Sequence, residues 1–271
     1  MSEAEQKLIQ ADVPPAIPTP NTASAPKGRP NPWVYALIVI GVILAALWAF
    51  NRPDFTGTPT TETISQPITA ASAEITLDTT VGRLEVSANA SGKLIDGTFE
   101  LGGKDRLQRG LVTRNDVQIV RLEAVTSGVT IGVAPLINRN DLSWKIGLAP
   151  KLPIKLRVTV GVGVGNLELT KLNVTDLTVT SGVGQMTVTL PKAGKVTANI
   201  EGGIGELKII IPRGMQAQIR ASNDLGKVNV SGDFERSGDL YTSSGFASAV
   251  NRVQLTVKGG IGGVTVEQSS R

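Results

Sequence analysis

The chain has 271 residues, a formal net charge of +4, and neither histidine nor cysteine. Without those two residue types, a Ser-His-Asp triad, a Cys-His catalytic pair, an HExxH metal site and a Cys/His zinc cluster are all excluded. The charge is spread thinly along the chain with no long basic run, so we expect no nucleic-acid-binding tract.

Residues 1–32 are predicted to form a disordered tail. They contain seven prolines between Pro14 and Pro32 and few large apolar residues. Such a segment buries too little apolar surface to offset the entropy lost on folding.

Residues 33–50 are predicted to form a single transmembrane helix. The segment reads WVYALIVIGVILAALWAF, eighteen residues without a charge. At 1.5 Å per residue it spans roughly 27 Å of a hydrocarbon core about 30 Å thick. Lys27 and Arg29 precede the span and only Arg52 follows it closely, which favours a cytoplasmic N-terminus and an extracytoplasmic C-terminal part. Residues 51–72 are rich in Thr, Ser and Pro and are expected to be an extended linker.

Residues 73–271 are predicted to be one all-β domain. Short runs of Val, Ile, Leu and Thr alternate with polar residues and are bounded by Gly, Asn, Asp and Pro. The clearest of these runs are EITL, RLEV, DVQIV, GVTIGV, LRVTVGV, LELTKLNV, DLTVT, MTVTL, KVTANI, ELKIII, QAQIRA, KVNVSG and VQLTV. No window in this region shows the 3.6-residue apolar period of an amphipathic helix.

One short phrase, a glycine followed by two apolar residues at alternate positions, recurs through the domain. Its central glycines are Gly82, Gly165, Gly184, Gly205, Gly226 and Gly262. The steps from Gly165 to Gly226 are 19, 21 and 21 residues. A repeat of this length is typical of a solenoid, so we expect a β-solenoid, a parallel β-helix-like coil with glycines at its corners and each turn stacked on the turn before. The less regular residues 73–150 and the loop between Gly232 and Gly245 are expected to cover its ends.

Three segments carry a family resemblance: ITLDTTVGRLEV, the stretch from LSWKIGLAPKLPIKL to VGQMTVTLP, and EGGIGELKIIIPRGMQAQIR. Together they resemble the bacterial toast-rack family, the β-solenoid domains at the C-termini of Lia-type envelope-stress proteins, and related adhesin-type domains. The resemblance covers most of residues 73–271. It implies a membrane-tethered extracytoplasmic domain that senses or regulates envelope stress, or that binds at the cell surface.

The remaining candidates for chemistry are acidic. Parallel β-coils can carry polysaccharide-cleaving carboxylate pairs, so Glu168, Asp176, Glu201 and Glu206 are considered as an acid and base. Glu168 is aligned by the glycine phrase with outward Thr187, Lys208, Asn229 and Thr265, a variety that favours a solvated face over a catalytic site.

Two further sets of residues are candidate contact sites. Lys104, Arg106, Arg109, Arg114 and Arg121 form the densest basic stretch and indicate a solvated face or, less favoured, a contact with an anionic envelope component. Trp144 and Tyr241 are expected to pack over the ends of the coil, with ligand contact as the alternative.

The sequence thus favours a non-enzymatic, single-pass membrane protein that presents a β-solenoid to an envelope protein or surface polymer. No cofactor and no metal site is expected. Self-assembly into a structural or adhesive array, with oligomerisation through the solenoid, stays open as an alternative, and a carbohydrate-active enzyme as a less favoured one.

Overall fold

The computed structural model describes residues 60–102, 105–126 and 142–269, all within one compact unit. The predicted tail and transmembrane segment, residues 1–32 and 33–50, lie outside the described residues. Within the described part of the chain, no helix has the length and apolar character needed to cross a bilayer. The described chain is all-β, as predicted.

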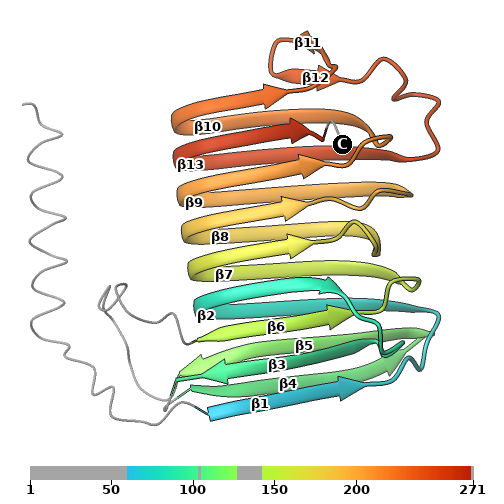
Figure 1. Ribbon diagram of the computed structural model, residues 1–271, viewed down its shortest axis with the longest axis vertical. Helices are drawn as coiled ribbons and strands as arrows, with labels where there is room; N and C mark the ends of the chain where they lie inside the picture. Colours follow the sequence, from blue (N-terminus) through green and yellow to red (C-terminus); the bar gives the residue numbers. More distant parts are fainter. Residues whose placement is uncertain (1–59, 103–104, 127–141, 270–271) are drawn as a thin grey trace, which may run out of the picture. The chain divides into compact units, whose positions relative to one another are not determined.

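The body of the domain is a stack of long parallel strands, each bent in the middle (Figure 1). These strands are β2 (Ser72–Ala88), β7 (Pro153–Glu168), β8 (Asn173–Thr189), β9 (Lys195–Ile211), β13 (Arg252–Gln268) and β10 (Gln216–Ser231), named in the order in which they stack. Before and after the bend, alternate side chains point into a shared core. In β7, Ile154, Leu156 and Val158 fill the first half of the core and Leu167 fills the second. The two-residue alternation of the sequence therefore builds both walls of a coil.

Shorter strands close one end of the stack, where the pattern changes from parallel to antiparallel. They are β1 (Thr60–Gln66), β3 (Ile95–Leu101), β4 (Asp105–Arg114), β5 (Val117–Thr126) and β6 (Ser143–Leu148). β5 pairs with the first half of β2 and β6 with its second half, while β3 and β4 run antiparallel to β6 and β5. β1 continues this end beyond β3, so residues 60–66 of the expected linker 51–72 form a strand of the folded unit.

Aromatic side chains fill this antiparallel end. Phe99 and Trp144 meet edge to face, with ring centroids 4.9 Å apart and an interplanar angle of 81°. Trp144 is 4% exposed, so it packs inside the end of the core and is not available to a ligand. At the opposite end, half-buried Tyr241 packs against the core and lies under the guanidinium of Arg236.

The stacking order departs from the chain order at that opposite end. β13 lies between β9 and β10, and β10 is the outermost long strand (Figure 1). A hairpin of β11 (Glu235–Ser237) and β12 (Leu240–Thr242) covers part of its outer edge. The expectation that every turn stacks on the turn before it is therefore wrong for this final pair.

Side-chain polarity explains the order. Val253, Leu255 and Val257 of β13 stand level with Ala217, Ile219 and Ala221 of β10, so β13 brings the larger apolar side chains to the core. A terminal strand has a neighbour on one side only, so the more polar strand is better placed there.

Candidate interaction surface

The bend in each long strand is made by a glycine with positive φ. Six such glycines stack in one column: Gly82, Gly163, Gly184, Gly205, Gly262 and Gly226, with φ from +127° to +143°. A Cβ on Gly184 would lie 1.9 Å from the carbonyl oxygen of Gly163, well inside van der Waals contact. In chain order, the corner glycines of β7, β8, β9 and β10 follow one another at intervals of 21 residues.

Gly165 was predicted to be a corner glycine, and the structure places it elsewhere. It lies two residues after the corner and pairs with Leu84 and Met186, which are core residues. A Cβ on Gly165 would lie 2.5 Å from the sulfur of Met186, so the methionine fills the space that the glycine leaves. The three glycines of GVGVGN allowed the phrase to be aligned two residues late, and a strict 21-residue period would have selected Gly163.

A ridge of aliphatic side chains follows this corner along the stack. The residue before each corner glycine forms it: Val81, Val162, Val183, Ile204, Ile261 and Leu225. Val183 is 37% exposed, Ile261 49%, Ile204 51% and Leu225 62%, while Val81 and Val162 are half-buried. Exposed apolar residues scattered singly need no explanation, but this continuous row makes the corner the candidate interaction surface of the domain.

Glycines on both sides make the ridge stand out from the surface. In the four central strands a second glycine precedes the aliphatic residue: Gly161, Gly182, Gly203 and Gly260. A Cβ on any of them would lie 2.3 to 2.5 Å from a carbonyl oxygen of the neighbouring strand. In these four strands the aliphatic residue is therefore the only one of the three corner residues that carries a side chain.

The four carboxylates considered for catalysis are exposed and do not come together. Glu168 lies at the end of β7 and accepts a hydrogen bond from Thr170. Glu201 is 4.0 Å from Lys258 on the flat face before the corner, and Glu206 lies just after the corner. In the strand register none of the four stands opposite another.

The register also corrects the alignment of Glu168. Asn166, and not Glu168, is level with Glu85, Thr187, Lys208, Thr265 and Asn229. Glu168 is level with Thr189. Among the described residues no group of three or more Asp and Glu side chains could hold a metal ion.

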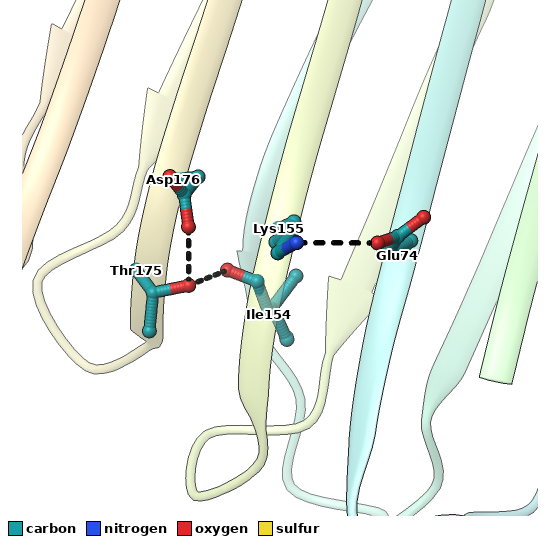
Figure 2. Close-up of polar contacts among 5 residues, drawn as sticks. All are labelled: Glu74, Ile154, Lys155, Thr175 and Asp176. Carbon is teal, nitrogen blue, oxygen red and sulfur yellow. Dashed lines mark hydrogen bonds and ion pairs between the residues drawn. The ribbon is translucent and has the colours of Figure 1, made fainter. Parts of the chain in front are cut away.

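Figure 2 shows the fourth candidate, Asp176, at the start of β8. The Nζ of Lys155 lies 3.4 Å from a carboxylate oxygen of Glu74 on β2. Asp176 is level with Lys155 but accepts a 2.9 Å hydrogen bond from the hydroxyl of Thr175. Thr175 is the extra residue of a β-bulge, and the carbonyl oxygen of Ile154 lies 3.5 Å from its hydroxyl. Asp176 thus takes part in a structural contact on an exposed, charge-alternating column.

A small hollow lies behind the ridge, between β8, β9, β13 and β10. Ser181, Gly202 and Gly259 line it where β7 carries the larger Val160. The amide nitrogen of Asn223 donates a 2.8 Å hydrogen bond to the carbonyl of Gly262, while its buried oxygen has no partner among the described residues. The hollow has room for about one water molecule, which rules it out as a site for a larger ligand.

The basic stretch lies at the antiparallel end. Arg109 forms an ion pair with Glu62, which joins β4 to β1 across the end of the core. Arg106, Arg114 and Arg121 are exposed, and Lys104 lies outside the described residues. Because Glu62 neutralises Arg109, the basic surface that remains on β4 and β5 is modest.

One carboxyl group near this end has a shifted pKa. Burial raises the pKa of Asp78 above its usual value of 3.8, and the neighbouring carboxylate of Glu123 adds to the shift. The two residues stand level on β2 and β5, so their charges oppose each other directly.

Comparison with known proteins agrees with this architecture. Residues 55–210 match the family described as the N-terminal domain of toast_rack. A proposed cell adhesion protein from Clostridium sporogenes, solved as a crystal structure, is 26% identical, with a TM-score of 0.71 over 78% of this chain and all of that one.

A proposed adhesin from Bacteroides fragilis is more distant, at 14% identity and a TM-score of 0.33 over 77% of this chain and 97% of its own. Among curated proteins none matches the chain. The family match extends over more than half of the chain and includes four of the six corner glycines. The chain therefore belongs to the toast-rack family.

Proposed function

We propose that this protein is a non-enzymatic surface module that uses the aliphatic ridge of a rigid solenoid to bind an envelope protein or surface polymer. The ridge is the observation that carries the proposal. Four of its residues are more than a third exposed, although the core-facing aliphatic side chains of β8, β9 and β13 are at most 4% exposed. The description of the Clostridium protein as a proposed cell adhesion protein supports a role in surface binding.

The module is proposed to be held outside the membrane by residues 33–50, with the N-terminus in the cytoplasm. The support for this topology is the uncharged eighteen-residue segment and the basic residues that precede it. Protease added outside intact cells should then cut the segment near Thr58. An uncut segment, with a surface control cut, would reverse the orientation.

A role in envelope stress is the finer proposal. The family resemblance supports it, and a regulator of this kind would bind its partner differently in stressed and unstressed cells. A self-assembling adhesive module is the second candidate, supported by the adhesion description of the Clostridium protein.

The test is site-specific photo-crosslinking in intact cells. A photoreactive amino acid at Ile204 should capture a partner, and the same residue at Asn199 should capture much less. Both positions are exposed and lie on β9, but Asn199 is on the flat polar face. Equal capture at the two positions would contradict the ridge as the binding surface. Capture of only a second copy of this chain would favour self-assembly.

A further inference from the structure

The strand β13 lies between two strands that could pair directly with each other. Gly262 of β13 is level with Gly205 of β9 and with Gly226 of β10. Leu255 is likewise level with Ala198 and Ile219. β9 and β10 therefore share one register, and moving β10 by one strand spacing, about 4.8 Å, would stack its corner glycine on that of β9.

The connection between β9 and β10 has the length of a connection between adjacent strands. Residues 212–215 join β9 to β10, and residues 169–172 join the adjacent strands β7 and β8. The corner glycines of β9 and β10 are 21 residues apart, as are those of the adjacent strands β8 and β9. This connection is therefore long enough for β9 to pair directly with β10 if β13 leaves.

The place that β13 occupies between β9 and β10 is called the slot, and a released β13 would need another one to rebury its apolar side chains. Its inward residues Val253, Leu255, Val257, Val264 and Val266 are at most 2% exposed in place. The outer edge of β10 is covered at Gln218–Arg220 by β12, so the released strand cannot simply move to the end of its own stack. An equivalent slot exists between β9 and β10 of a second copy.

The segment before β13 can act as the hinge. In residues 243–250 the backbone hydrogen bonds are short-range, from Phe246 to Ser243 and from Ala249 to Phe246, apart from the one that holds Ser243 to Ala217 of β10. Val250 is 78% exposed. Extended, eight residues reach about 26 Å, enough to bridge to a neighbouring solenoid.

We propose that β13 is a releasable strand: the slot between β9 and β10 closes when β13 leaves it and reopens to accept β13 of its own chain or of a second copy, so that two copies can exchange this strand. Exchange preserves every β9–β13 and β10–β13 pair and alters only the hinge, which is the condition for domain swapping. The inference is independent of what the aliphatic ridge binds.

The first experiment tests whether the slot can close. Thr197, Gln254 and Gln218 stand level on β9, β13 and β10 with their side chains on the outer face. With β13 in place, positions 197 and 218 are two strand spacings apart, about 9.6 Å, which is beyond the reach of a disulfide. The chain has no cysteine of its own, so a Thr197→Cys/Gln218→Cys variant carries a single possible bond.

We expect that bond to form within single full-length chains under mild oxidation, and β13 to become sensitive to protease once it has formed. The Thr197→Cys/Gln254→Cys variant, which joins strands already adjacent, is the positive control. If the control bond forms and the 197–218 bond does not, the slot does not close and the proposal is overturned.

The second experiment tests exchange between copies. Two differently tagged full-length chains, one with Thr197→Cys and one with Gln254→Cys, are co-expressed and oxidised. A disulfide-linked heterodimer joined at these two positions is expected, in an amount that rises with protein concentration.

The matched control uses Thr178→Cys and Asn199→Cys, which stand level on β8 and β9. These strands follow each other in the chain, so exchange at β13 leaves them within one copy. Heterodimer in equal yield from the control pair would mean lateral association without exchange and would overturn the proposal, as would heterodimer from neither pair.

Discussion

The stacked corner glycines predict a graded response to alanine. Gly184→Ala places a Cβ 1.9 Å from the carbonyl oxygen of Gly163, at a φ of +135°. Relief requires β8 to move by about 1.5 Å, which breaks or bends roughly two interstrand hydrogen bonds at about 0.5–1.5 kcal/mol each. Positive φ for an L-residue adds about 1–2 kcal/mol. The expected loss of unfolding free energy is therefore about 2–5 kcal/mol.

Two other glycines separate the two causes. Gly214 has a φ of +85° but nothing within 4 Å of the place that an added methyl group would occupy, so Gly214→Ala should cost only the backbone term of about 1–2 kcal/mol. Gly263 has neither feature, so Gly263→Ala should change stability by less than about 0.5 kcal/mol. Urea unfolding followed by circular dichroism measures all three. If Gly184→Ala is no less stable than Gly214→Ala, the close stacking of corners does not limit the residue type there.

Three further predictions concern the core, the carboxylate pair and the ridge. Met186→Ala should lower the unfolding free energy by about 2–5 kcal/mol. Gly165→Ala should be less destabilising in that variant than in the unaltered chain, which a double-mutant cycle by urea unfolding measures. Additive losses of stability would contradict the packing of Met186 over Gly165. Because the folded-state pKa of Asp78 is raised, folding takes up protons there, and stability falls as pH rises through the raised value. Asp78→Asn should therefore raise the melting temperature at pH 7, with the gain disappearing below pH 3.8, and a gain that persists in acid would refute this sign. Ile204→Ser should leave the melting temperature nearly unchanged, since its side chain is 51% exposed, and a large drop would show that the ridge serves stability.

Sequence reasoning predicted the coil because its signal is local and repeated. Each long strand carries its own glycine and its own aliphatic alternation, so the class of fold followed from the phrase alone. The exposed ridge was in the same phrase, as the residue before each glycine. The ridge was missed because the apolar–polar alternation does not predict where the side chain before the glycine points. The bend in the strand is what turns that side chain toward solvent.

The ends of the coil were predicted less well. In phase with their buried residues, β1 carries Glu62, β3 carries Gly97 and β4 carries Arg109, where the central strands carry aliphatic residues. This part of the coil is covered less completely than its middle, so it tolerates these residues. The position of β13 could not follow from local pattern, since β10 and β13 both fit the repeat. Their order depends on which strand tolerates the outermost place, a property of the assembled core.

The bulge at Thr175 shows where the coil absorbs irregular lengths. The connection before β8 has four residues and the connection before β9 has five, yet both strands reach their corners after the same 21-residue interval. The extra residue of the bulge makes up the difference before the flat part of β8 begins. Single-residue insertions and deletions should therefore be accommodated at strand starts, whereas a change at a corner would put every later rung out of phase. Lengthening such a rod by design calls for whole 21-residue units copied from one corner glycine to the next.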